Sequence, residues 1–381
     1  MAKKEKQNEM DASLDLDSII KGIDGATVLY ENHILNTRGK VRSKIEILNC
    51  LLGGGRPYGS ITGSFGPPTG GKSTEAYESA AEFLRQEPDG IVIILDQESS
   101  ADPSRLEFLG LNTHRSIRVK SESIDSGFDK LLELIDVVDK KQKIVNKKIP
   151  IFVVWDTITK GKSEDDEEAS RMGARNRARV IKSRMNDLNP WLDKIDVILI
   201  LLNQVILGSD MYGNETVNAG GGVGLKHDEH LRLYINKKKT KYDDLTGMAT
   251  QDFSTIALDK TKLSPKINNI PVVFDVINGG RIDEEYSFLL FFEERKLFLA
   301  AGGWWHITPI IEMSSEKPYY DYLSSFSGNK RYDDWVNLIK TNNHNNNCHF
   351  KKFSVYKTKF SYYLKLNKLF KTTSGILIHS S

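Results

Sequence analysis

The sequence predicts an α/β fold in which a mostly parallel, twisted sheet is flanked by helices. Three apolar runs end in polar residues and have the form of strands buried on both faces: residues 90–96, 149–157 and 196–204. Helix-forming segments with apolar residues at helical spacing lie between them, as the crossovers of a parallel sheet require. A glycine-rich loop before the first of these helices suggests a ligand site at one edge of the sheet.

That loop, residues 66–73, fits the phosphate-binding pattern G-x-x-x-x-G-K-[ST] without a mismatch. In this pattern Lys72 reaches the β- and γ-phosphates and the Ser73 hydroxyl ligates Mg²⁺, while backbone N–H groups at the helix N-terminus hold the anion. Residues 59–65 favour a strand and residues 73–84 a helix, a context that disfavours the alternative of an ordinary Gly/Pro turn. The residues predicted to bind the nucleotide here are Gly66, Pro67, Pro68, Thr69, Gly70, Gly71, Lys72, Ser73 and Thr74.

Length and composition favour a soluble protein of two or three folding units. The 381 residues suffice for a core of roughly 200–250 residues with smaller appendages. The chain has no run of about 18 apolar residues and no apolar signal segment behind its polar start, so we expect a cytoplasmic protein without a membrane partner. Its two cysteines, Cys50 and Cys348, are too few for a disulfide framework or a metal cluster.

Charge and composition divide the chain into four expected segments. The net charge is +2, but eight lysines and no acidic residue follow Asp334, so the chain without that stretch carries 2 − 8 = −6. A basic, unpatterned tail of this kind predicts disorder. The helical arm at the N-terminus packs either on its own domain or on a neighbouring subunit. The segments are the arm 1–39, the core 40–280, a small C-terminal α/β region 281–340 and the tail 341–381.

Acidic residues follow two of the predicted strands. Asp156 closes the second run, where an aspartate holds Mg²⁺ in P-loop enzymes, and Thr157 stands beside it. An aspartate at a strand end is often without function, but its place downstream of a complete phosphate loop favours the metal role. Asp96, Glu98 and Asp102 lie at or just beyond the end of the first run, at the sheet edge where ligands collect.

Two further segments favour contact with nucleic acid. A predicted helix over residues 171–184 concentrates cations, which suits a polyphosphate backbone, although a solvated helix face is the alternative. Residues 205–224 are rich in glycine with almost no periodicity, which indicates either a functional loop or disorder. Strands resume at 231–235, 255–259 and 270–276, and we expect an antiparallel edge there.

These motifs together resemble the RecA family of ATP-dependent DNA strand-exchange recombinases, and within it the short, diverged phage type (UvsX-like), over about residues 40–305. The segment 95–98, followed by Ala101-Asp102-Pro103, is similar to the family strand that carries the catalytic glutamate. The resemblance implies that Glu98 activates the attacking water, that Asp102 lies beside adenine, and that Gln204 senses the γ-phosphate.

The resemblance also implies a subunit interface and a DNA surface. Lys260 and Lys262 match paired lysines that reach the γ-phosphate of a neighbouring subunit, and their spacing on a strand puts both on one side, although such a pair on its own suits a solvated edge strand. Arg105 stands where the bacterial pattern has an aromatic residue on adenine, which leaves base selectivity open. The residues implied in DNA binding are Arg175, Arg177, Arg184, Met211, Tyr212, Gly221 and Gly222.

The leading hypothesis is therefore a DNA-dependent ATPase that forms filaments on single-stranded DNA and catalyses homologous pairing and strand exchange in recombination, repair or phage replication. Its implied cofactors are ATP and Mg²⁺; its implied partners are single- and double-stranded DNA, further copies of the chain in a helical filament, and single-strand-binding and mediator proteins. The alternative is a hexameric RecA-like DNA helicase or another ring-forming DNA-dependent ATPase, although no second ATPase repeat is seen. A third reading, a paralogue that binds DNA without turnover, conflicts with intact Lys72, Ser73, Glu98 and Asp156.

Overall fold

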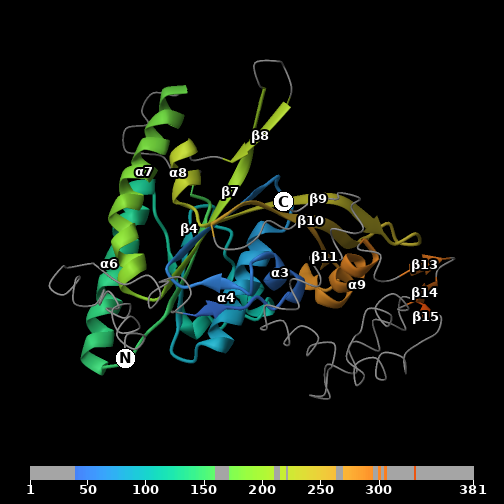
Figure 1. Ribbon diagram of the computed structural model, residues 1–381, viewed down its shortest axis with the longest axis horizontal. Helices are drawn as coiled ribbons and strands as arrows, with labels where there is room; N and C mark the ends of the chain where they lie inside the picture. Colours follow the sequence, from blue (N-terminus) through green and yellow to red (C-terminus); the bar gives the residue numbers. More distant parts are fainter. Residues whose placement is uncertain are drawn as a thin grey trace, which may run out of the picture.

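The computed structural model describes residues 39–158, 171–209, 215–219, 222–262, 269–294, 299–301, 304–306 and 330–331. Within these ranges a ten-stranded sheet in the order β12-β11-β10-β9-β3-β7-β6-β4-β5, with β8 paired to β7, runs through the molecule (Figure 1). The α/β fold with a mostly parallel sheet is confirmed. The predicted helical arm and the basic tail lie outside the described residues.

The central strands are parallel and those beyond β9 are antiparallel, as the sequence predicted for that edge. The parallel strands are β3 (Ser60–Gly66), β4 (Ile91–Asp96), β5 (Ser116–Val119), β6 (Ile151–Asp156), β7 (Val197–Ser209) and β9 (Leu231–Tyr242). The antiparallel strands are β10 (Ala249–Thr261), β11 (Ile270–Asp275) and β12 (Arg281–Asp283).

Alternation along the central strands sends neighbouring side chains into two different helical layers. Val153 and Leu199 face α6 (Ile124–Val145) and α7 (Arg171–Lys194), which lie together at one side of Figure 1. Val154 and Ile200 face the layer of α4 (Lys72–Gln86) and α5 (Pro103–Phe108). Because the central strands are buried on both faces, their sequences are continuous apolar runs, and these runs predicted the strands.

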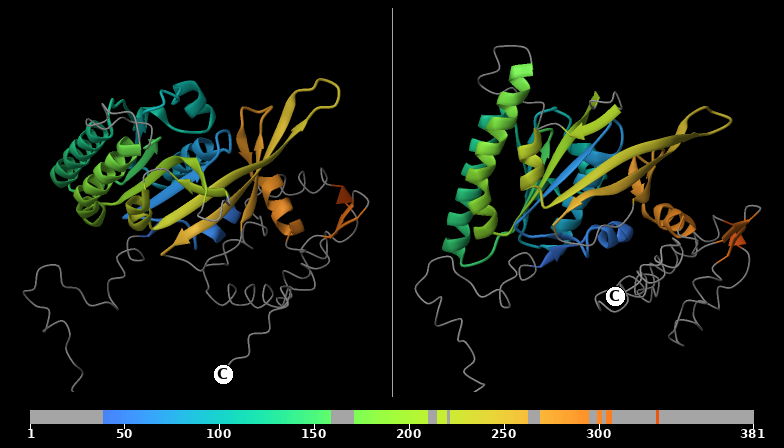
Figure 2. Two further views of the ribbon diagram at one scale, coloured as in Figure 1. Left: turned by 90° about the horizontal axis from the view of Figure 1, so that it is seen from above. Right: turned by 45° about the horizontal axis from the view of Figure 1, so that its top comes forward.

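The antiparallel half of the sheet has a core of its own. Apolar residues of β9, β10 and β11 pack against α3 (Glu46–Leu51), and α9 (Glu284–Glu294) lies against β11. β12 pairs with β11, so the large sheet continues past residue 280, where the sequence placed a domain boundary; that division stays a prediction. The hairpin of β9 and β10 projects well beyond the rest of the sheet (Figure 2).

The glycine-rich segment 205–224 is more regular than its sequence suggested. β7 continues to Ser209 and pairs with β8 (Glu215–Ala219), and α8 (Gly222–Asp228) follows. Backbone pairing needs no apolar pattern, so periodicity could not reveal this hairpin. Met211, Tyr212 and Gly221 lie outside the described residues.

Short elements complete the described chain. β1 (Lys40–Val41) pairs with β2 (Arg56–Pro57), and a 3₁₀ turn, Thr113–Arg115, leads into β5. A separate three-stranded sheet holds β13 (Leu299–Ala301), β14 (Trp304–His306) and β15 (Lys330–Arg331). Among the described helices none is long and apolar enough to cross a bilayer.

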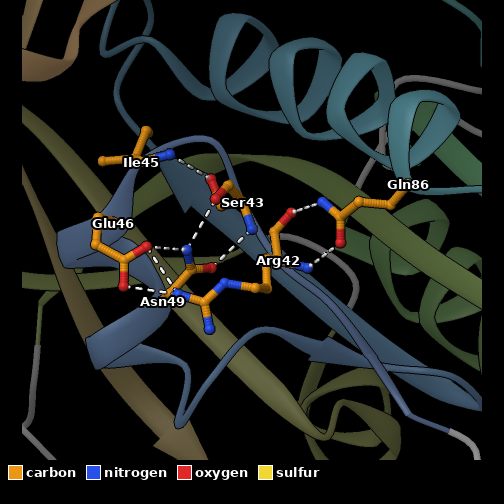
Figure 3. Close-up of polar contacts among 6 residues, drawn as sticks. All are labelled: Arg42, Ser43, Ile45, Glu46, Asn49 and Gln86. Atoms are coloured by element: carbon orange, nitrogen blue, oxygen red, sulfur yellow. Dashed lines mark hydrogen bonds and ion pairs between the residues drawn. The ribbon is translucent and has the colours of Figure 1, made fainter. Parts of the chain in front are cut away.

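Two side-chain amides fix the irregular segment between β1 and α3 (Figure 3). Gln86 receives a hydrogen bond from the Arg42 N–H at 3.0 Å and donates to the Arg42 carbonyl at 2.8 Å. Asn49 does the same for Ser43, at 2.7 and 2.8 Å. Each amide thus pairs with the N–H and the carbonyl of one residue, as a neighbouring strand would. Asn49 is buried, whereas Gln86 is exposed.

Because the two amides differ mainly in burial, they form a matched pair of variants. We expect Asn49→Ala to lower the free energy of unfolding by about 2–4 kcal/mol, since it leaves the buried Ser43 N–H and carbonyl without partners. Gln86→Ala should cost less than about 1 kcal/mol, because water replaces the exposed amide. Urea unfolding of both variants measures the difference; equal losses would show that burial does not set the cost.

Candidate active site

The phosphate loop joins the carboxyl end of β3 to the start of α4, as the sequence predicted. Gly71 has a φ of 98°, and a Cβ there would lie 2.1 Å from the Phe274 ring. A Cβ on Gly66 would lie 1.9 Å from the Ile235 carbonyl oxygen. Both glycines are therefore required by close packing, and α4 begins without a side-chain cap, so the N–H groups of its first turn remain for an anion.

Lys72 lies folded over this loop. Its ammonium donates to the carbonyls of Gly66 and Pro67 at 2.9 and 2.8 Å. Burial lowers the pKa of Lys72, and the carboxylates of Asp156 and Glu98 oppose that shift. A phosphate would offer this cation charge-assisted hydrogen bonds, which are stronger than those to neutral carbonyls.

Ser73 and Asp156, the two residues predicted to hold Mg²⁺, lie in contact with each other. The Ser73 hydroxyl donates to Asp156 Oδ2 at 2.8 Å, and the Tyr77 hydroxyl lies 3.3 Å from the same oxygen. Burial raises the pKa of Asp156, while the hydrogen bonds from Ser73 and Thr157 act in the opposite direction. One hydroxyl and one carboxylate beside a phosphate loop suit Mg²⁺, which takes its other ligands from phosphates and water. In the described ranges no three His, Cys, Asp or Glu side chains form a metal cluster.

Glu98 joins the ends of three neighbouring strands. Its Oε1 lies 2.9 Å from the Thr157 hydroxyl and accepts a hydrogen bond from the Gln204 amide at 3.2 Å. Thr157 also lies 2.9 Å from Asp156 Oδ1. The structure thus brings Gln204, Glu98, Thr157, Asp156 and Ser73 into one polar chain, although they belong to four separate sequence motifs. A carboxylate at this place can orient and deprotonate a water molecule.

The other two acidic residues near β4 have different surroundings. Asp96 is buried and accepts from the N–H groups of Ser100 and Ala101 at 3.0 and 3.1 Å and from Arg118 Nε at 2.9 Å. It stabilises the turn that carries Glu98. Asp102, which the resemblance places beside adenine, caps α5 by accepting from the Arg105 N–H at 2.9 Å, and it does not line the cavity beside the phosphate loop.

A cavity of about 450 Å³ opens beside the phosphate loop. Arg105 borders it from α5, and the antiparallel half of the sheet supplies the opposite wall. This size and mixed lining are typical of small-molecule sites. The lining residues are Thr69, Gly70, Gly71, Lys72, Ser73, Thr74, Arg105, Asp252, Phe274, Val276, Gly279 and Gly280.

The paired lysines lie at the C-terminal end of β10 and do not line this cavity. Lys260 donates to the carbonyls of Lys226 and His227, the latter at 3.2 Å, and Lys262 donates to His227 at 2.8 Å. Both therefore cap the C-terminus of α8, where cations are favourable. A register shift between Leu258 and Lys260 turns the strand end toward α8. Burial, followed by repulsion from Lys262, lowers the pKa of Lys260.

The basic helix α7 uses some of its cations within the fold. Arg184 forms ion pairs with Asp125 at 3.7 Å and with Asp129, which tie α7 to α6. Lys182 pairs with Asp228 of α8 at 2.7 Å. Arg177 is half-buried in α7, whereas the side chain of Arg175 lies outside the described residues, and Gly222 is the first residue of α8.

Sequence reasoning missed three residues of the site. Tyr77 follows Ser73 by one helical turn, so helical spacing was the available signal. Phe274 and Arg118 come from segments without a motif. Only the fold brings Phe274 under Gly71 and Arg118 beside Asp96.

Comparison with known proteins finds relatives over most of the chain. A family model described as the RecA N-terminal domain matches residues 27–282. The protein RecA of Zymomonas mobilis subsp. mobilis is 27% identical over 316 residues, which cover 78% of this chain and 82% of the relative. RecA of Arthrospira platensis is 26% identical over 305 residues (78% and 76%), and RecA of Latilactobacillus sakei subsp. sakei is 26% identical over 314 residues (80% and 82%).

The general-base role of Glu98 can be tested by substitution. Glu98→Gln keeps the size and the hydrogen bonds but removes the base, so we expect ATP hydrolysis to fall by about 10²–10⁴-fold while nucleotide binding persists. Steady-state turnover and equilibrium binding measure the two effects. Glu107→Gln, an exposed residue of α5 outside the site, is the control and should keep the parental rate. Normal hydrolysis by Glu98→Gln would remove the general-base role.

Proposed function

The chain belongs to the RecA family, and from this premise we propose that it is a recombinase of the short phage type (UvsX-like), a DNA-dependent ATPase that forms helical filaments on single-stranded DNA. In these filaments it pairs the bound strand with a homologous duplex and exchanges strands. It acts in the cytosol, and single-strand-binding and mediator proteins assist its loading. Its place is in recombination and repair, or in phage replication.

The observation that carries this proposal is the polar chain from Gln204 to Ser73. Gln204 belongs to β7, and the same strand continues into the β7–β8 hairpin and α8. Glu98, which accepts from Gln204 at 3.2 Å, and Asp156 are the two carboxylates in this series of five side chains. A ligand that moves the hairpin therefore moves Gln204, and through it changes the orientation of Glu98. This connection supports an ATPase controlled by DNA rather than a constitutive one.

The residues of the site divide the chemistry among them. Lys72 and the first-turn N–H groups of α4 bind the phosphates, and Ser73 with Asp156 holds Mg²⁺, which when bound neutralises phosphate charge. Glu98 accepts the proton of the attacking water, and Thr157 holds the carboxylate in place at 2.9 Å. Positioning and charge stabilisation supply most of the catalysis in phosphoryl transfer.

We place DNA on the segments around α7 and α8. Arg175 and Arg177 contact the phosphate backbone, and Met211 and Tyr212 separate bases in the extended strand. The ion pair of Lys182 with Asp228, at 2.7 Å, joins the two helices, so that contacts on one reach the other. Arg184, already bound to Asp125 and Asp129, has to exchange these partners to contribute.

Lys260 and Lys262 act across a subunit interface. In the single chain their ammonium groups are bound to α8 carbonyls, away from the chain's own nucleotide cavity. In a filament they exchange these neutral carbonyls for the γ-phosphate bound to the neighbouring subunit, a stronger, charged partner. The exchange releases the C-terminus of α8 and so links nucleotide state to the DNA segment before it.

We expect single-stranded DNA to stimulate ATP turnover, because the hairpin that follows Gln204 is the proposed DNA contact. Turnover with and without DNA, at several salt concentrations, measures this; DNA affinity should fall steeply with salt as cations release counterions. Electron micrographs with DNA and a slowly hydrolysed ATP analogue should show helical filaments. Equal rates with and without DNA, or closed rings, would contradict the proposal.

The double substitution Lys260→Ala and Lys262→Ala should leave nucleotide binding to isolated subunits nearly unchanged, because neither lysine lines the cavity. It should abolish DNA-dependent turnover, which needs the assembled interface. Lys140→Ala with Lys141→Ala on α6, remote from both sites, is the matched control for loss of two positive charges. If the variant hydrolyses ATP on DNA at the parental rate, the interface role is wrong.

A further inference from the structure

Arg105 spans the nucleotide cavity between two parts of the fold. Its guanidinium donates to the Thr74 hydroxyl of α4 and to the Gly279 carbonyl of the turn after β11, both at 3.3 Å. The Asp102 cap fixes the start of its helix by accepting from the Arg105 N–H at 2.9 Å. The guanidinium plane is thus held at the border of the cavity by two hydrogen bonds, one to each wall.

Three polar groups of the opposite wall already have partners within the protein. The Gly279 carbonyl accepts from Arg105 at 3.3 Å, and the Gly280 N–H donates to the Asp275 carbonyl at 2.7 Å. The Asp252 carboxylate binds Lys237 and Thr240, both at 2.7 Å. These three groups are among those that would otherwise read the hydrogen-bonding edge of a base.

A base in this cavity contacts the protein mainly through its flat face. A guanidinium plane stacks on any base, since every base has a π-face, and such stacking tolerates changes of sequence or substituent. Val276 and the two glycines of the turn add surface without donors or acceptors in their side chains. Strong discrimination between similar ligands depends on dedicated hydrogen bonds, and three polar groups of this wall already form theirs within the protein.

We propose that the cavity accepts purine nucleoside triphosphates with little discrimination between adenine and guanine, and that Arg105 determines this by stacking on the base while occupying the Gly279 carbonyl. GTP is then a second substrate beside ATP. The inference rests on the proposed function in one respect, namely that the phosphate loop binds a nucleoside triphosphate.

Competition against a fluorescent ATP analogue tests the inference by binding alone. We expect ATP and GTP to compete with the parent protein within about tenfold of each other. Arg105→Ala should weaken both on the order of tenfold, because it removes the stacking plane from each. Arg105→Tyr retains a stacking face and frees the Gly279 carbonyl to accept from the adenine amino group, so preference for ATP over GTP should rise by about tenfold.

The control is Arg85→Ala, which removes an exposed arginine of α4 that is paired with Glu82, and it should leave both affinities unchanged. Since Arg105 is itself exposed, its substitutions do not disturb the core. A parent that prefers ATP by a hundredfold or more overturns the inference, as does Arg105→Ala with unchanged affinities. Failure of the recombinase proposal is seen separately, as binding of nucleotide without any DNA-dependent turnover.

Discussion

The site depends on one constraint, the common alignment of the carboxyl ends of β4, β6 and β7. Asp96 pairs in register with Asp156, and Trp155 with Leu201, so that the residues just after these strands meet at one edge. Only there can the Thr157 hydroxyl lie 2.9 Å from both Glu98 and Asp156. A shift of one residue in any of the three strands would turn these side chains to the other face of the sheet.

The phosphate loop has its shape because the antiparallel half of the sheet packs beneath it. Phe274 of β11 and the Ile235 carbonyl of β9 occupy the space where side chains of Gly71 and Gly66 would lie. The Ser254 hydroxyl of β10 donates to the Gly70 carbonyl at 3.1 Å. The loop is therefore held from below by β9, β10 and β11, and the first turn of α4 remains open to an anion.

Two groups of cations outside the polar chain of Glu98 join separate elements of the fold. The lysine caps on α8 use hydrogen bonds to neutral carbonyls, which an ammonium gives up readily for a phosphate. Arg105 uses two hydrogen bonds of 3.3 Å to hold a flat surface over the cavity. In both cases a cation joins two elements of the fold by hydrogen bonds to neutral groups.

The sequence by itself determined the elements whose signal is local. Apolar runs buried on both faces located β4, β6 and the start of β7, and the complete loop pattern located Gly66 to Ser73, because each depends on neighbouring residues alone. The extension of β7 into a hairpin and the full lengths of β9 and β10, which the sequence predicted only over 231–235 and 255–259, escaped prediction, since glycine and lysine carry no apolar alternation there. Tertiary structure alone decided that Asp96 accepts a hydrogen bond from Arg118, that Phe274 lies under Gly71, and that Lys260 caps α8. These pairings join residues far apart in the chain, and only the register of the sheet and the crossing of its layers bring them within a few ångströms.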